Sequence, residues 1–407
     1  MLIPAKTISV QDWMRAPEIV AVFDVLQDAG LGPQVLIVGG AVRNTIIGLP
    51  PGDCDLATVY SPDQVTARLT GAGIKVVPTG IDHGTVTAVI NSKTFEITTL
   101  RRDVKTDGRH AVVTFTADWR EDAKRRDFTI NTLLMDLNGK IFDPIRSGII
   151  DLEKGKIIFV GDPAQRIAED HLRILRFFRF HALYGKGAPD RAALDACRAA
   201  AQRVSSLSRE RITQELIKIL CVSNPEDILE IMFENKVMVD VLHPKADLGV
   251  LRRLCDLQNQ LDIDNSCFES RLSVLAAGHT DHVPVFEKYL SLSRVQSKLL
   301  DLCLNSFSGE INLQECLYRN GREAGAQMAL MNAAARGHVL DHASLDMIRN
   351  WVKPVFPLSG DDLKDIGVPP GPGMGRILSE IESWWVESGF KQNRAQCLDR
   401  ARDRIQG

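Results

Sequence analysis

Residues 35–44 read VLIVGGAVRN, and residues 53–58 read DCDLAT. The β-branched run at 35–38 predicts a short strand that enters a tight turn at Gly39-Gly40. Residues 41–48 predict a helix, and residues 53–58 predict a second strand after a loop rich in proline and glycine. Two short strands joined by a glycine turn and a helix indicate the start of a mixed α/β domain.

The α/β character continues outward from this stretch and then gives way to helices. The first 30 residues are expected to be a helix-rich lead-in, and residues 129–136 and 140–143 to be a helix or strand entering a hairpin-like turn. From residue 162 onward the apolar spacing is helical. We therefore predict an α+β protein, with a mixed sheet in its N-terminal part and helices after it. Further strands are expected at 75–77, 85–90, 94–100 and 112–116.

The charge balance excludes a protein that binds nucleic acid through its overall charge. The 407 residues carry 49 Lys+Arg and 52 Asp+Glu, a formal net charge of −3. Positive charge is concentrated locally, since residues 101–126 hold eight basic and five acidic side chains and residues 166–186 hold five and two. Such segments suit contact with an RNA backbone, although a solvated charged face gives the same pattern.

Cysteine usage and hydropathy indicate the compartment. The eight cysteines include no CxxC pair, which indicates free thiols in a reducing environment and argues against structural zinc. No apolar run approaches the roughly 18 residues of a membrane span, and the first residues lack the cationic and apolar segments of a secretion signal. We expect a cytoplasmic protein with no membrane partner.

The first group of candidate site residues surrounds the glycine turn. A turn at Gly40 has no Cβ to keep a phosphate away, and Arg43, one helical turn later, can add a guanidinium to the same anion. Asp53 and Asp55 are two apart on a predicted strand, so both carboxylates are expected on one face, where they suit Mg²⁺ together with substrate phosphates. Each piece alone also fits a plain turn or a solvated acidic pair.

The second group is RRDFTIN, at residues 125–131. Arg125 and Arg126, beside Asp127 and Asn131, can bind a triphosphate and a ribose hydroxyl together. A charged turn before a buried segment explains the same residues.

The third group is EDHLRILRFFR, which starts at Glu169. Helical spacing places Asp170, Arg173 and Arg176 along one edge. Glu169 and Arg173 also form an i,i+4 pair of the kind found on solvated helices. Against that interpretation, Arg173, Arg176 and Arg179 repel one another unless an anion lies among them, which favours an anionic ligand.

In this order the motifs resemble the class II tRNA nucleotidyltransferases, the CCA-adding enzyme and poly(A) polymerase family of the polymerase β superfamily. The resemblance covers about residues 35–181. It implies a nucleotidyltransferase head at 1–147, a helical neck with a base-selecting helix at 148–220, and a helical body and tail that bind tRNA at 221–407. It is carried further by HGTVT at 83–87, EITTLRRDVKTDGRH at 96–110, FDPI at 142–145 and GDPAQRIAEDHLRILRFFRF at 161–180, with a looser similarity in SGDDLKDIGVPPGPGMGRIL at 359–378.

The resemblance assigns roles to the first group. Asp53 and Asp55 would hold catalytic Mg²⁺, which activates the 3′-hydroxyl of tRNA for in-line attack on the α-phosphorus. Gly40 and Arg43 would cradle the triphosphate. Glu96, on the next strand, is either a third carboxylate or a structural residue.

The resemblance also implies that Arg126, with Asp127 close by, would contact the ribose of the nucleotide. One departure from the family pattern GGxVRD is Asn44 in place of aspartate. Because that acid is not a metal ligand in the pattern, we expect activity to survive, but the substitution leaves open how Arg43 is oriented.

Base choice would fall to Asp170 and Arg173, which accept from an amino group and donate to the adjacent ring nitrogen of cytosine or adenine. Uracil and guanine would leave polar groups unpaired, at about 1–3 kcal/mol each. Arg176 and Arg179 would support this pair or the phosphates. The segment 100–110 would be the flexible loop that favours full CCA synthesis.

We therefore expect an enzyme that adds C, C and A to tRNA 3′ ends from CTP and ATP without a template and releases pyrophosphate. The alternatives are a poly(A) polymerase, a CC-only tRNA nucleotidyltransferase, and a non-catalytic RNA-binding protein that kept the fold. His279, Asp281 and His282 are too crowded for a phosphohydrolase signature and are read as a surface loop. The sequence leaves the oligomeric state open.

Overall fold

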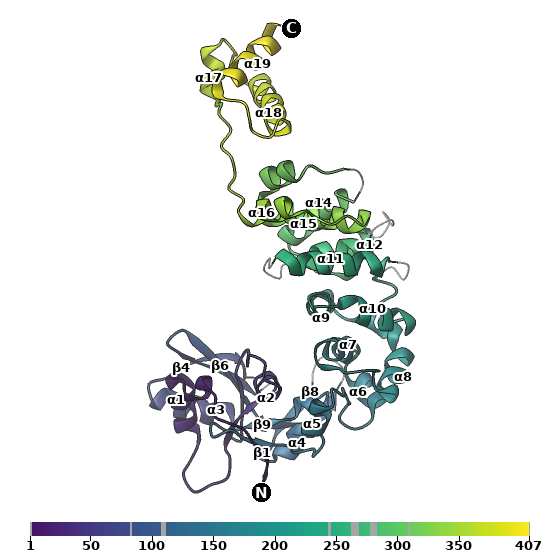
Figure 1. The fold of residues 1–407 in the computed structure, drawn as a ribbon. Helices are drawn as coiled ribbons and strands as arrows, with labels where there is room; N and C mark the ends of the chain where they lie inside the picture. Colours follow the sequence, from purple (N-terminus) through teal and green to yellow (C-terminus); the bar gives the residue numbers. More distant parts are fainter. Residues whose placement is uncertain are drawn as a thin grey trace. The chain divides into compact units, whose positions relative to one another are not determined.

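The structure is a computed structural model, and two compact units account for the chain (Figure 1). The N-terminal unit comprises residues 1–215 and 231–238, and the C-terminal unit comprises residues 216–230 and 239–407. The structure describes residues 2–81, 84–106, 111–242, 246–261, 268–276, 283–307 and 310–406. His83, residues 107–110 of the expected flexible loop, and the expected surface loop with His279, Asp281 and His282 lie outside the described residues.

Strands occur in the N-terminal unit. Within the described residues, eight of them form one mixed sheet in the order β1-β10-β9-β2-β3-β6-β5-β4, and β7 pairs with β8 in a separate ribbon. The bounds are β1 Pro4–Thr7, β2 Val35–Val38, β3 Asp55–Thr58, β4 Lys75–Gly80, β5 Thr85–Ile90, β6 Lys93–Thr99, β7 Arg101–Thr106, β8 Ala111–Phe115, β9 Leu134–Met135 and β10 Lys140–Phe142.

The centre of the sheet is formed by β2, β3 and β6. All four side chains of β2 are buried, as expected for a β-branched run with both faces covered. Strand β2 pairs antiparallel with β3, and β3 pairs parallel with β6. The parallel register sets Leu56 opposite Ile97, so Asp55 and Glu96, one residue earlier on each strand, are cross-strand neighbours.

Short helices connect and cover the sheet. Helices α1 and α3 contact each other, and α3 contacts β4 and β5. The helices that belong wholly to the N-terminal unit are η1 Asp12–Arg15, α1 Pro17–Leu26, α2 Gly40–Ile46, α3 Pro62–Gly71, α4 Trp119–Lys124, η3 Thr129–Asn131, α5 Gly148–Glu153, α6 Pro163–Glu169, α7 Leu172–Tyr184, α8 Arg191–Ala199 and η4 Ala201–Ser206.

An aromatic cluster anchors the RRDFTIN segment to α7. The Phe128 ring is fully buried, and its centroid lies 4.7 Å from that of Phe159 and 5.3 Å from that of Phe180. Phe159 in turn stacks on Phe177 at 5.9 Å. These contacts hold the polar residues beside Phe128 in a defined position relative to the arginines of α7.

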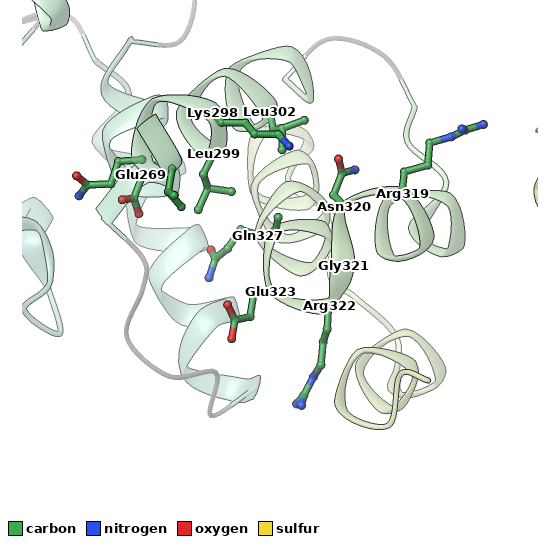
Figure 2. Close-up of a pocket in the computed structure, with 13 residues that line it drawn as sticks. Glu269, Lys298, Leu299, Leu302, Arg319, Asn320, Gly321, Arg322, Glu323 and Gln327 are labelled. Atoms are coloured by element: carbon green, nitrogen blue, oxygen red, sulfur yellow. The ribbon is translucent and has the colours of Figure 1, made fainter. Parts of the chain in front are cut away.

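The rest of the described chain is helical. Helix α15 merges two helices across a kink at Gly321, where φ is 81° (Figure 2). Helices α9 Arg209–Leu220 and α10 Pro225–Glu234 cross the boundary between the units. The C-terminal unit contains α11 Leu248–Leu261, α12 Phe268–Ala276, α13 Val283–Tyr289, α14 Arg294–Asn305, α15 Leu313–Arg336, α16 His342–Arg349, α17 Gly360–Asp365, α18 Pro372–Glu387 and α19 Arg394–Gln406.

The predicted α+β class, with a mixed sheet followed by helices, is confirmed. The lead-in differs from the expectation, because it begins with β1, which pairs with β10 from more than 130 residues away. The strand expected at 53–58 starts only at Asp55. These differences arise because strand pairing depends on a partner that is distant in the sequence.

Candidate active site

A pocket of about 650 Å³ in the N-terminal unit brings most of the expected site residues together. Six arginines and four carboxylates line it, so its formal charge favours an anionic ligand. Asp53 and Arg179 are not among its lining residues. The expected residues that line it are Gly40, Arg43, Asp55, Glu96, Arg125, Arg126, Asp127, Asn131, Asp170, Arg173 and Arg176.

The carboxylates at the start of β3 form an acidic cluster. Asp55 is partly buried, and burial, together with the charges of Glu96 and Asp53, raises its pKa to about 6, against an opposing effect of Arg126. Asp53 is exposed and lies in a bend before β3, so it is outside the strand that was expected to carry both carboxylates. Its charge still acts on Asp55, so the two acids lie near each other.

The glycine turn opens the other side of the pocket. Gly39 has φ 69° and ψ −125°, a conformation that side chains disfavour, and α2 begins at Gly40. Arg43, one turn into α2, is 7% exposed. Its Nη1 donates to Asn131 Oδ1, and its Nη2 donates to the Tyr184 hydroxyl at 3.1 Å. Its buried Nε has no partner among the described residues.

The RRDFTIN segment is bound mainly to other protein groups. Arg126 donates through Nε and Nη2 to Asp122 at 3.1 and 3.0 Å, and Arg125 donates to the same carboxylate at 2.8 Å. Although burial opposes ionisation of Asp122, these two arginines hold its pKa below the usual value. Asp122 therefore fixes the direction of both arginine side chains, a role that the sequence interpretation missed.

Asp127 is buried and fully engaged. It accepts from Arg176 Nε at 2.7 Å, from Asn131 Nδ2 at 2.9 Å and from the Phe128 backbone N–H at 2.8 Å. Burial opposes ionisation, but Arg176 and the hydrogen bonds outweigh it and lower the pKa of Asp127 to about 2. The carboxylate therefore links the RRDFTIN segment to α7.

The third group is not one continuous helix. Helix α6 ends at Glu169, and Asp170 is extended, with φ −156° and ψ 108°. Aspartate favours such positions because its side chain can cap the following helix, and here Oδ1 accepts from the Leu172 N–H at 3.0 Å. The prediction that Asp170 shares a helical edge with Arg173 and Arg176 is therefore wrong, although all three line the same pocket.

Protein carboxylates neutralise the arginines of α7. Arg173 donates to Glu169 at 2.6 Å, which is the i,i+4 pair expected from the sequence. Arg176 pairs with Asp127, and Arg179 Nε lies 3.2 Å from Glu215 Oε2. Acidic side chains of the protein therefore offset the repulsion among these arginines, so their spacing alone is not evidence for an anionic ligand.

Helix α9 supplies two partners that the sequence interpretation missed. Glu215 pairs with Arg179, and Arg211 donates to Asp170 Oδ2 at 2.7 Å. Their i,i+4 spacing places both on one face of α9. That spacing is the only local signal in α9, and it does not identify Asp170 and Arg179, which lie far earlier in the chain, as the partners of Arg211 and Glu215.

A larger pocket, of about 930 Å³, lies in the C-terminal unit around the kink at Gly321 (Figure 2). Its polar residues are of mixed sign, including Glu269, Lys298, Arg322 and Glu323. Among the described residues, no group of three or more histidine, cysteine, aspartate or glutamate side chains is arranged to hold a metal ion in either pocket. The smaller pocket is the better candidate for chemistry because it combines grouped acids with an arginine-rich wall.

Two family matches cover parts of the chain. Residues 35–158 match the Poly A polymerase head domain, and residues 188–247 match the family described as probable RNA and SrmB-binding site of polymerase A.

None of the helices in the described part of the chain combines the length and apolar character that a bilayer crossing requires.

Whole-chain comparisons are more specific. The chain is 32% identical over 377 residues to CCA tRNA nucleotidyltransferase 1, mitochondrial, of Mus musculus, covering 90% of this chain and 86% of that protein. It is 29% identical to the CCA-adding enzyme of Ligilactobacillus salivarius, covering 94% and 95%. The fold matches the crystal structure of Bacillus stearothermophilus CCA-adding enzyme in complex with CTP with a TM-score of 0.74 and 26% identity, covering 96% and 98%.

The fold and these matches define a nucleotidyltransferase whose N-terminal part is a polymerase head. Because relatives of nearly the same extent are CCA-adding enzymes, the chain belongs to the family of CCA-adding tRNA nucleotidyltransferases. Nucleotidyltransferases of this family use divalent metal ions. The relationship supports CCA addition over the alternatives of a poly(A) polymerase, a CC-only enzyme or a non-catalytic RNA-binding protein.

Proposed function

We propose that the arginine-lined pocket of the N-terminal unit is the centre at which this enzyme adds C, C and A to the 3′ end of tRNA. The substrates are CTP, ATP and tRNA, and each addition releases pyrophosphate. The observation that carries the assignment of the pocket is the acidic cluster at the start of β3, which faces a wall of arginines.

The acidic cluster fits a divalent cation. The pKa of Asp55 is raised by burial and by the neighbouring charges of Glu96 and Asp53, and a cation held there would relieve that repulsion. Asp53 and Asp55 are the proposed ligands of Mg²⁺, and Glu96, the cross-strand neighbour of Asp55, either adds a third carboxylate or has a structural role. When bound, the ion supplies Lewis-acid stabilisation of charge on the phosphates and activation of the attacking hydroxyl.

The arginines would hold the nucleotide for in-line transfer. The tRNA 3′-hydroxyl oxygen bonds to the α-phosphorus as the bond from that phosphorus to the β-phosphate oxygen breaks, and pyrophosphate leaves. Arg43 and the backbone at Gly40 would bind the triphosphate, and the free Nε–H of Arg43 is a donor that a phosphate oxygen would satisfy. Arg126, held by Asp122, would meet the ribose, with Asp127 fixing the segment behind it.

Asp170 and Arg173 are the proposed base-selecting pair. Their other contacts orient them and still leave hydrogen-bonding groups for a base. Each oxygen of the Asp170 carboxylate can accept a second hydrogen bond, and Arg173 Nη2, which donates to the Arg125 carbonyl at 3.4 Å, keeps a second N–H. Arg176 and Arg179 act in support, through Asp127 and Glu215.

We also propose the domain roles stated above: a head at 1–147, a neck at 148–220, and a body and tail at 221–407 that bind tRNA. The match of residues 188–247 to a probable RNA-binding family supports an RNA contact beyond the head. A cytoplasmic location is proposed because five of the cysteines in the described part of the chain are free thiols, as expected in a reducing compartment; they are Cys54, Cys197, Cys303, Cys316 and Cys397.

Product analysis tests the function. The protein is incubated with tRNA lacking CCA and with all four nucleoside triphosphates, and the products are sequenced. Addition that stops after C, C and A supports the function. A growing A-tail, or arrest after two C residues, would overturn it in favour of the corresponding alternative.

Single substitutions test the site. Asp55→Asn and Asp53→Asn are expected to abolish incorporation while the protein remains folded, because the variants keep the side-chain size and lose only the charge. Asp24→Asn, on α1 and outside this pocket, is the matched control and should leave incorporation unchanged. Normal incorporation by either Asp53 or Asp55 variant would remove that residue from the catalytic assignment.

A further inference from the structure

The Arg43 guanidinium is held by a side chain from the far end of α7. The Arg43 Nη2 donates to the Tyr184 hydroxyl at 3.1 Å, and the Arg43 Cζ atom lies 4.4 Å from the centroid of the Tyr184 ring. The same hydroxyl donates to Asn44 Oδ1 at 3.0 Å. Tyr184 therefore accepts from the arginine and donates to the residue next to it in the chain.

The second amide atom of Asn44 explains why asparagine suits this position. Asn44 Nδ2 donates to the Pro50 carbonyl at 2.9 Å, and the Asn44 backbone carbonyl accepts from the Leu49 N–H at 2.9 Å. Because Nδ2 is used by the carbonyl, Oδ1 is the atom that faces Tyr184. A carboxylate at position 44 has no hydrogen to donate, and it would set an oxygen against the Pro50 carbonyl.

Asn44 thus joins two parts of the site. Residues 49 and 50 belong to the loop that leads from α2 to Asp53, while Tyr184 holds Arg43. Arg43 is buried, and both of its terminal nitrogens are used, Nη1 by Asn131 and Nη2 by Tyr184. A guanidinium restrained at both ends is preorganised to present its remaining N–H donors, including the one on Nε, in fixed directions.

We propose that Tyr184 and Asn44 are positioning residues, which orient Arg43 toward the triphosphate of the incoming nucleotide and couple it to the loop that carries Asp53. The proposal rests on the proposed function, in which Arg43 binds the triphosphate. The proposal explains how Arg43 is oriented when asparagine replaces the usual aspartate at position 44. Asn44 Oδ1 accepts from the Tyr184 hydroxyl, and that hydroxyl accepts from Arg43.

The test separates the hydroxyl from the ring. Tyr184→Phe removes the hydrogen bonds and keeps the aromatic face over Arg43. Inorganic tripolyphosphate, used as a competitor of CTP, reports on the triphosphate subsite without a base. One hydrogen bond lost at an oriented arginine is expected to raise the tripolyphosphate inhibition constant about threefold to tenfold. The KM values for CTP and ATP should rise by the same factor, with a smaller change in kcat.

A matched control and a second variant keep the test decisive. Tyr60→Phe removes another hydrogen-bonded hydroxyl of the N-terminal unit, which donates to Asp28 at 2.6 Å, and it should leave the inhibition constant unchanged. Asn44→Ala should reproduce the effect of Tyr184→Phe, and the double variant should be no worse than Asn44→Ala alone, because both changes break one chain of contacts.

Arg43→Ala distinguishes the two ways of failing. If Arg43→Ala leaves the tripolyphosphate inhibition constant unchanged, the proposed triphosphate role of Arg43 is wrong. If Arg43→Ala weakens inhibition while Tyr184→Phe and Asn44→Ala do not, the positioning proposal is overturned and the role of Arg43 stands. Additive effects of Tyr184→Phe and Asn44→Ala would also overturn it, because the two residues would then act separately.

Discussion

Replacing Asp127 by asparagine is expected to destabilise the N-terminal unit, because it breaks the ion pair of the buried Asp127 carboxylate with Arg176, which joins the RRDFTIN segment to α7. The Asp127 side chain is 9% exposed, and its Oδ2 lies 2.5 Å from Arg176 Nη2. In Asp127→Asn the Arg176 guanidinium keeps a weaker ion pair with Glu215, whose nearest oxygen is 3.9 Å away. The Arg176 side chain is 30% exposed, so solvent screens part of the charge that the substitution leaves without a close partner.

The size of the expected stability loss follows from the lowered pKa of Asp127. The pKa of Asp127 lies at about 2, against an ordinary value of 3.8, because Arg176 and the hydrogen bonds to the carboxylate outweigh its burial. A tenfold change in proton affinity corresponds to about 1.4 kcal/mol, so the ionised carboxylate contributes about 2 kcal/mol. Because the Arg176 side chain is 30% exposed and solvent screens its charge, the expected loss in free energy of unfolding stays at about 2 kcal/mol.

The sign of the pH dependence is also defined. A depressed pKa means that the stabilisation is fully present above about pH 4 and is lost as the pH falls toward about 2. Urea unfolding of wild type and Asp127→Asn is measured at pH 7, 4 and 3. The difference between their free energies of unfolding should become smaller as the pH decreases.

The control is Asp28→Asn. Asp28 forms a bidentate pair with Arg68, but the Asp28 side chain is 42% exposed, against 9% for Asp127, and such exposed pairs contribute little to stability. Equal stability of Asp127→Asn and wild type at pH 7, or a gap that does not change with pH, would refute this account of the ion pair.

Three further substitutions have defined outcomes. Phe128→Ala removes a fully buried ring that packs 4.7 Å from Phe159, and thermal unfolding should show a loss of about 3–5 kcal/mol. Gly39→Ala forces a side chain into a conformation with φ 69° at a cost of about 1–3 kcal/mol, and steady-state kinetics should show a higher KM for both CTP and ATP; an unchanged KM would separate this turn from nucleotide binding. Arg173→Ala should raise UTP incorporation relative to CTP by about tenfold in a misincorporation assay, since about 1–3 kcal/mol of discrimination is lost; unchanged preference would contradict the base-selecting role.

Local patterns were most informative where one segment carries its own signal. The strand at 35–38 and the helix after Gly39-Gly40 were predicted because β-branched runs, glycine turns and helical spacing act over a few residues. The glycine turn, Asp55 and RRDFTIN were selected for the same reason, and the structure brings them to one pocket. Their catalytic and binding roles stay predictions.

Contacts between distant segments were not predictable. Asp122 was read as part of a charged stretch, yet it orients both Arg125 and Arg126. Tyr184 lies 141 residues after Arg43, and nothing in either segment identifies the other as its partner. The break in the helix at Asp170 was missed because the helical spacing of the side chains continues through this residue. The Asp170 backbone is nevertheless extended, and its carboxylate accepts from the Leu172 N–H at the start of α7.

The amino-acid sequence alone determined most of the elements of this protein, the order of its motifs and the kinds of chemical group that each motif offers, since these depend on spacing within one segment. Tertiary structure decided which groups meet. The parallel register of β3 and β6 brings Glu96 beside Asp55, and the packing of α7 and α9 supplies carboxylates to arginines that would otherwise repel. Electrostatic energy depends on distance in space, and sequence spacing specifies that distance only within a helix or a strand.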